Sequence, residues 1–215
     1  VPLMIVALAG VFAERSGIIN LALEGIMIFG AFIGVLFVRT MQGSEVFAAA
    51  KAAGDYATLQ GLEIMAMVVA ALLGAIFSLL LSFASINLRA DQTIGGTALN
   101  LLATALALVA AKRFNGSQSG KVDFDNSAFS FNIGPLTLNV FFFIGIVILI
   151  AAFVVLYKTR FGLRLSACGE HPQAADSVGI NVYKMRWCGV LISGVLGGIG
   201  GFAYIVPSVS SWNFE

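Results

Sequence analysis

The residue with the clearest potential for chemistry is Glu24, an acid inside an otherwise apolar stretch. Residues 18–38 are long enough to cross a bilayer and carry Glu24 as their one charged side chain. A carboxylate in a membrane span is costly and points first to a solute or ion pathway. Asn20 precedes it by four residues, which on a helix would place both on one face. We expect Asn20 and Glu24 to line a pathway; the alternative is that Glu24 fixes packing, near an interface or paired with Arg15.

Asn100 is the third candidate for the pathway. It lies in the apolar segment 95–111, with Thr93, Thr97 and Thr104 near the same face. Amides buried between helices bond to neighbouring helices as often as to ligands. A helix-to-helix hydrogen bond is therefore the alternative for Asn100.

The chain offers no constellation for catalysis or for holding a metal ion. His171 is the one histidine, and Cys168 and Cys188 are too few and too unpatterned for a disulfide framework or a metal site. No Ser/His/Asp or Cys/His arrangement and no GxxxxGK[ST] phosphate loop occurs. We predict no catalytic residue, no cofactor and no ATP hydrolysis in this chain, and the net charge of +1 without a Lys/Arg run indicates no nucleic-acid partner.

Composition places these residues in a membrane protein. Hydrophobic residues make up 59% of the chain and charged residues 11%, whereas soluble domains carry about a quarter charged residues. Segments 64–83, 137–156 and 187–206 are free of charge over about the 20 residues that a bilayer requires, and 18–38 and 95–111 nearly so. We predict an all-α polytopic membrane protein with at least five transmembrane helices.

The first thirteen residues are apolar but too short to span alone. They predict a partial or broken N-terminal helix that ends near Gly17. The chain begins without Met and stops just after an apolar segment, so we expect truncation at both ends. Residues 1–215 then form a single, incomplete transmembrane domain. The Ala-rich segment 47–53 predicts a short interfacial helix, and residues 116–132 an ordered loop on the outer side.

Small residues indicate where helices approach closely. Gly194 and Gly198, and Gly197 and Gly201, form two overlapping pairs spaced by three residues, and Gly30 and Gly34 form another. Such pairs let helix backbones come into van der Waals contact. We predict that these six glycines pack helices, either within the domain or between subunits.

Residues 158–186 form the longest polar block, and it is net basic. The positive-inside rule places this block in the cytoplasm. Pro172 can open a short helix there and Gly179 can end it. Small residues at Ala174, Ala175 and Gly179 would give that helix a thin face for a partner's groove, with Arg160 and Arg164 beside it. An ordinary charged loop that fixes topology is the alternative.

Three motifs then carry a family resemblance along nearly the whole chain. ERSGIINLALEGIMIFGAF, INLRADQTIGGTALNLLA and FGLRLSACGEHPQAADSVGINV resemble the membrane permeases of ABC importers. The nearest group is the branched-chain amino acid/ribose-type permease family, in its nucleoside and simple-sugar branch. The family's coupling loop, Glu-Ala-Ala-x3-Gly, corresponds here to Gln173, Ala174, Ala175 and Gly179, with Gln in place of Glu.

The resemblance implies a permease subunit in the plasma membrane of a prokaryote. It would pair with a second permease, the same or paralogous, and form the path for a nucleoside or simple sugar. Separate ATPase subunits would bind ATP and dock at the loop 158–186, and an extracytoplasmic solute-binding protein would deliver the solute. The alternative is a secondary transporter or channel driven by an ion gradient, with Glu24 as the coupling carboxylate.

Overall fold

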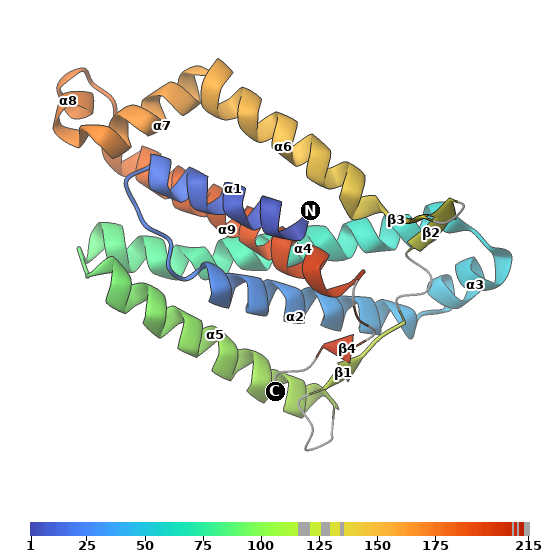
Figure 1. Ribbon diagram of the computed structural model, residues 1–215. Helices are drawn as coiled ribbons and strands as arrows, with labels where there is room; N and C mark the ends of the chain where they lie inside the picture. The colour runs from blue at the N-terminus through green and yellow to red at the C-terminus, as the bar shows by residue number, and fades with distance from the viewer. Residues whose placement is uncertain (116–120, 126–129, 134–135, 208, 210, 213–215) are drawn as a thin grey trace.

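The computed structural model describes residues 1–115, 121–125, 130–133, 136–207, 209 and 211–212. The chain folds into a helical bundle with two short β-ribbons (Figure 1). The helices are α1 (Pro2–Arg15), α2 (Leu23–Gln42), α3 (Glu45–Ala53), α4 (Tyr56–Ser82), the π-helical turn η1 (Phe83–Asn87), α5 (Gln92–Asn115), α6 (Val140–Lys158), α7 (Arg160–Glu170), α8 (Pro172–Ser177) and α9 (Val182–Ile205). The ribbons pair β1 (Val122–Asp123) with β4 (Ser211–Trp212), and β2 (Ser130–Ile133) with β3 (Leu136–Asn139), both antiparallel.

Five helices in the described part of the chain are long and apolar enough to cross a membrane: α2, α4 with η1, α5, α6 and α9. They coincide with the five segments predicted from the sequence, and the all-α polytopic fold is confirmed. The short helix expected at 47–53 is α3. Of the loop predicted at 116–132, residues 116–120 and 126–129 lie outside the described residues.

Helix α9 is the centre of the bundle, packing against α1, α2 and α4. The glycines of α9 allow this close packing because they have no side chain, so the backbone of α9 itself lies at the contact. A Cβ atom on Gly198 would lie 2.3 Å from the Ala70 carbonyl oxygen of α4, and one on Gly30 of α2 would lie 2.7 Å from the Gly198 Cα. Gly34, Gly194, Gly197 and Gly201 likewise lie where α9 meets α2 or α4. The structure thus places all six glycines at contacts within the domain.

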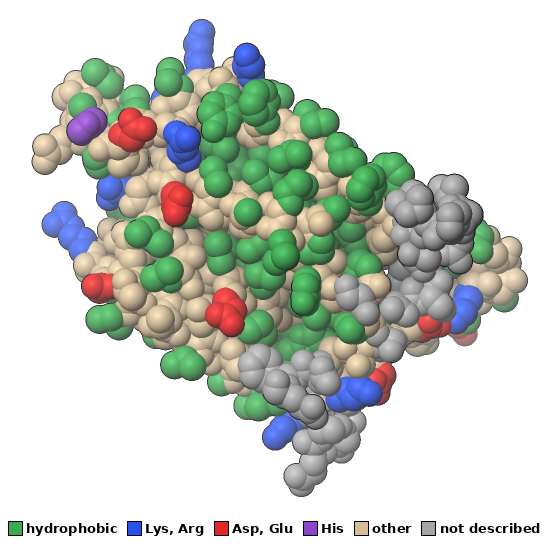
Figure 2. All heavy atoms as spheres, in the orientation of Figure 1, with side chains coloured by type: hydrophobic (Ala, Val, Ile, Leu, Met, Phe, Trp, Pro, Cys, Tyr) green, Lys and Arg blue, Asp and Glu red, His purple; other side chains and the backbone are tan. Residues whose placement is uncertain are grey.

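The two ends of the bundle differ in character. Helices α7 and α8 lie at one end, called here the α7–α8 end; α3 and both ribbons lie at the other, the ribbon end (Figure 1). At the first end, side-chain caps fix where α7 and α9 begin: the Thr159 hydroxyl accepts from the Gly162 N–H, and Asn181 Oδ1 from the Lys184 N–H at 2.9 Å. Hydrophobic side chains cover the middle of the face in Figure 2, and most Lys and Arg lie towards the ends.

One expectation about a polar residue needs correction, and one buried acid was not predicted. Asn20 does not share a helical face with Glu24, because residues 16–22 are not helical and α2 begins only at Leu23. Gly17, where the break was expected, has a φ of 81°, a conformation natural to glycine. The segment 64–83 is indeed free of charge, but α4 starts earlier, at Tyr56, so its acid Glu63 lies inside the helix and is 1% exposed.

Candidate functional site

The break between α1 and α2, residues 16–22, is held in place by two amide side chains. Asn20 donates from Nδ2 to the Ser193 hydroxyl of α9 at 2.9 Å, and its Oδ1 accepts from the Ala22 N–H at 3.2 Å. The second bond caps the backbone just before α2 begins. Asn20 is buried at 6% exposure, so in this structure its polar atoms bond to the protein and hold the break in place.

Asn100 of α5 holds the same segment from the other side. Its Nδ2 donates to the Leu21 carbonyl oxygen at 2.9 Å, and its Oδ1 accepts from the Gly25 N–H at 2.8 Å. Gly25 makes this approach possible, because a Cβ there would lie 2.8 Å from Asn100 Oδ1. Asn100 therefore bonds two backbone groups freed where the helix is interrupted. A role of Asn20 or Asn100 in a solute path stays a prediction.

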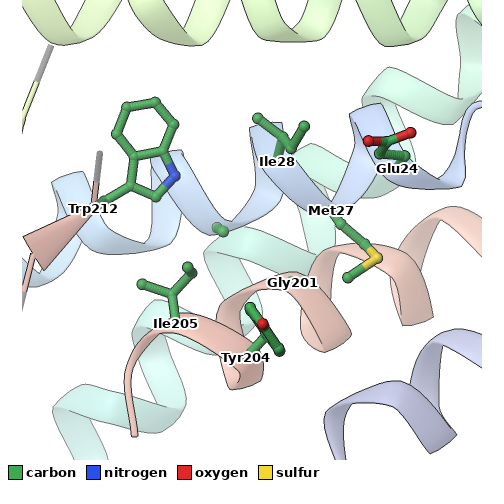
Figure 3. A pocket seen from close by; sticks show the side chains of 8 residues that line it. Glu24, Met27, Ile28, Gly201, Tyr204, Ile205 and Trp212 are labelled. Atoms are coloured by element: carbon green, nitrogen blue, oxygen red, sulfur yellow. The ribbon is translucent and has the colours of Figure 1, made fainter. Parts of the chain in front are cut away.

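Glu24 lies in the first turn of α2 and is exposed. It borders a cavity of about 230 Å³ between α2 and α9, called here the α2–α9 groove (Figure 3). The groove is lined by Glu24, Met27, Ile28, Ala31, Gly201, Tyr204, Ile205 and Trp212. Neither Asn20 nor Asn100 is among these residues.

The walls of the groove are apolar and aromatic, and its acid lies towards one end (Figure 3). Trp212 comes from β4 and is 3% exposed; its ring centroid lies 5.0 Å from that of Phe32. Tyr204 is half-exposed. An apolar pocket with few polar groups is typical of small-molecule sites. The aromatic rings can contact a flat solute, while the Glu24 carboxylate can accept hydrogen bonds from hydroxyl or amino groups.

Sequence reasoning missed the rest of this lining, although part of the signal was present. Met27, Ile28 and Ala31 follow Glu24 at helical spacing, three, four and seven residues later, and so share its face. Tyr204 has no such link in sequence to Glu24. Trp212 reaches the groove only because β4 pairs with β1, ninety residues earlier in the register Val122↔Trp212, a contact that no local pattern predicts.

The α7–α8 end presents the residues predicted to couple to a partner. Arg160 and Arg164 are exposed one turn apart on α7, and they border a shallow groove with Leu163, Ala167 and Ile180. The short helix expected after Pro172 is α8. It is followed by Gly179, whose φ is 81° and whose N–H donates to the Asp176 carbonyl oxygen at 2.9 Å.

The small residues of α8 do not all face outward. Gln173 and Ala174 are exposed, whereas Ala175 is 3% exposed and turned into the protein. Of the residues predicted to face a partner, α8 therefore presents Gln173 and Ala174, whereas Ala175 lies beneath them. Gly179 is exposed as well, with open space where a side chain would be.

The described ranges hold no cluster for a metal ion, and the Cys168 thiol is buried. Among these residues no three of His, Cys, Asp and Glu gather closely enough to hold a metal ion. Burial raises the pKa of the Cys168 thiol, an effect that the positive charge of Arg186 partly opposes. The thiolate is the nucleophilic form of cysteine, and a raised pKa makes it scarcer. We therefore interpret the buried Cys168 as a packing residue of α7.

Comparison with known proteins agrees with this architecture. The family described as "Branched-chain amino acid transport system / permease component" matches residues 1–214. The chain is 44% identical over 216 residues to the nucleoside ABC transporter permease protein NupC of Lactococcus lactis, covering 94% of this chain and 63% of NupC. It is 42% identical over 214 residues to the guanosine ABC transporter permease protein NupQ of Bacillus subtilis, covering 94% of this chain and 63% of NupQ.

The chain thus spans less than two thirds of the length of either relative. No solved structure matches it. Since the family match extends over residues 1–214 and five helices are fit to cross a membrane, this multi-pass membrane protein belongs to the family of permease components of branched-chain amino acid transport systems.

Proposed function

We propose that the chain is part of the permease subunit of an ATP-driven importer of nucleosides. The observation that carries this proposal is the identity, above 40% over 94% of the chain, with two permeases named for nucleoside and guanosine transport. The α2–α9 groove is consistent with such a solute, because it joins aromatic walls to one carboxylate.

In this proposal the groove is part of the translocation path. A nucleobase is planar and stacks on aromatic side chains, for which the half-exposed Tyr204 is placed, while the buried Trp212 forms part of the wall behind it. A ribose carries hydroxyl groups that can donate to the Glu24 carboxylate, and hydrogen bonds to a charged group are the stronger kind. A simple sugar would also use the carboxylate, so the choice of a nucleoside rests on the named relatives and not on the groove alone.

The α7–α8 end is proposed to face the cytoplasm and the ATPase subunits. Lys158, Arg160, Arg164, Lys184 and Arg186 all lie in or beside α7 and α8, as the positive-inside rule requires. ATP would bind to the ATPase partner, and α8 would dock on it. A second permease subunit, the same or paralogous, would complete the path, and an extracytoplasmic binding protein would deliver the solute at the ribbon end. The family match does not favour the alternative of an ion-gradient transporter.

The test is transport by the assembled importer. The full-length permease is reconstituted in proteoliposomes with its ATPase, and uptake of radiolabelled guanosine, uridine and ribose is measured with the loaded binding protein outside. We expect uptake of a nucleoside that needs ATP in the compartment of the ATPase. Uptake by the permease alone, driven by a proton or sodium gradient without ATP, would contradict the proposal, and ATP-driven uptake of ribose alone would overturn the substrate class.

A further inference from the structure

The break at residues 16–22 touches α7 backbone to backbone. A Cβ atom on Gly169, in the last turn of α7, would lie 2.6 Å from the Arg15 carbonyl oxygen, and one on Gly17 would lie 3.2 Å from the Gly169 Cα. No side chain separates these segments, so none can adjust to absorb a movement. Because protein interiors are packed as densely as crystals, a displacement of α7 either carries the break along or opens a gap beside it.

The break is also tied to the beginning of α5. The Ile19 N–H donates to Gln92 Oε1 at 2.8 Å, and Gln92 is the first residue of α5. Two turns further along α5, Asn100 bonds the Leu21 carbonyl oxygen and the Gly25 N–H. Between them, a Cβ on Gly96 would lie 2.6 Å from Leu21 Cβ. One face of α5 therefore contacts the break along the first two turns of the helix.

A second connection leads from α9 to the beginning of α5. The Tyr183 hydroxyl, in the first turn of α9 just after α8, donates to Asn87 Oδ1 at the end of η1. The turn 88–91 that follows contains Arg89 at a φ of 53°. It ends at Asp91, whose Oδ1 accepts from the Thr93 N–H at 2.7 Å and so caps α5. Two chains of contacts therefore lead from the neighbours of α8 to the start of α5. One runs from α7 through the break, and the other runs from α9 through η1 and the turn 88–91.

We propose that the break is the element through which movement of α7 and α8 reaches the solute path, and that Gln92, together with Asn100, makes α5 follow. This inference rests on the proposed function, in which ATP-driven closure of the partner displaces α8. When α7 shifts, the break shifts with it. Its bonds to Gln92 and Asn100 carry α5, and its continuation into α2 carries Glu24 at the edge of the groove. Gln92 acts here as a positioning residue, without contact to the solute.

The experiment measures ATP hydrolysis and nucleoside uptake on the same proteoliposomes of the full-length assembled transporter. Gln92→Met removes the acceptor for the Ile19 N–H at similar size, whereas Gln92→Glu keeps an acceptor oxygen. Thr97→Val is the matched control on α5, because the Thr97 hydroxyl bonds only carbonyl oxygens of its own helix, at 2.9 and 3.1 Å. Gly169→Ala perturbs the opposite contact of the break.

We expect Q92M and G169A to keep ATP hydrolysis but to spend more ATP per imported nucleoside, by roughly 2- to 30-fold, the range produced by mutations along a coupling route. Q92E and T97V should keep the wild-type ratio. A wild-type ratio in both Q92M and G169A overturns the inference. So does a parallel loss of hydrolysis, uptake and assembly in Q92M, because the bond would then only hold the fold. A wild-type transporter without ATP-driven uptake would instead contradict the proposed function.

Discussion

At the scale of single residues, the position of Glu24 decides what the groove can recognise. It is exposed, lies in the first turn of α2 and borders a cavity whose other walls are mainly apolar and aromatic. An anionic side chain near a helix N-terminus interacts favourably with the helix dipole. A charged acceptor at the edge of an aromatic groove suits a solute with hydroxyl groups on one side and a flat ring on the other.

Glu24→Gln therefore tests recognition directly. The change keeps the shape of the side chain and removes its charge. Since a hydrogen bond to a charged group contributes about 1.5–3 kcal/mol, the kcat/KM of nucleoside uptake should fall roughly 10- to 100-fold. Glu45→Gln is the control, because Glu45 is an exposed acid on α3, at the ribbon end and outside the groove lining. Unchanged uptake in the E24Q importer would exclude Glu24 from the path.

At the scale of elements, α8 shows how burial separates two adjacent alanines of one motif. Ala174 is exposed and Ala175 is 3% exposed. Ala174→Arg should leave the thermal stability of the permease unchanged and release the ATPase, since a bulky cation would replace a small side chain at the proposed docking surface. Ala175→Arg should lower the stability itself, because its charge would have to be buried. The measurements are co-purification of the ATPase and the melting temperature of the permease in detergent.

The two alanines are controls for each other in that experiment. Retention of the ATPase by the A174R permease would contradict docking through α8. A melting temperature of the A175R permease equal to that of the wild type would contradict the inward position of Ala175.

Helix α9 depends on glycine for its place at the centre of the bundle. Gly198→Ala puts a Cβ atom 2.3 Å from the Ala70 carbonyl oxygen, and backbone cannot turn aside as a side chain can. Overpacking of this kind costs about 1–3 kcal/mol, which lowers the melting temperature by roughly 2–10 °C. Gly61→Ala on α4 is the matched control: nothing lies within 4 Å of the added atom, so its melting temperature should stay equal or rise. A G198A protein as stable as the wild type would contradict this packing.

The elements that sequence predicts well are those with a local physical signature. Apolar length predicts the five spanning helices, and Pro172 with Gly179 predicts α8. Helical spacing predicts the wrong place for Asn20 because residues 16–22 are not helical, and its partner Ser193 lies 173 positions away. Glu63 directly precedes the charge-free segment 64–83, and only the start of α4 at Tyr56 shows that the helix carries this acid into the protein. The groove itself needs Trp212 from β4, which only the fold brings there.

At the scale of the whole molecule, the exterior of the protein must contact both lipid and water. Helix α6 lies at one edge of the bundle (Figure 1). It has the highest mean hydropathy of the five spans, 3.1, and only 22% of its apolar stretch is buried inside the protein. Its outward side chains, Val147 at 64% exposure among them, suit lipid chains. The α2–α9 groove is also open, but it carries Glu24 and the half-exposed Tyr204. A carboxylate is costly against lipid, so the groove should face water or a partner subunit across the path.

Spin-label accessibility distinguishes these two surfaces in a bilayer. Labels are attached through Tyr204→Cys in the groove and Val147→Cys on α6, each in a full-length permease with Cys168 and Cys188 replaced by alanine. Molecular oxygen concentrates in lipid and a nickel chelate in water. We expect nickel collisions to dominate at position 204 and oxygen collisions at position 147, because the proposed path would hold water along the groove, whereas the outward side chains of α6 suit lipid. Dominant oxygen collisions at position 204 would place the groove against acyl chains, and Glu24 would then have to act in helix packing instead of in transport.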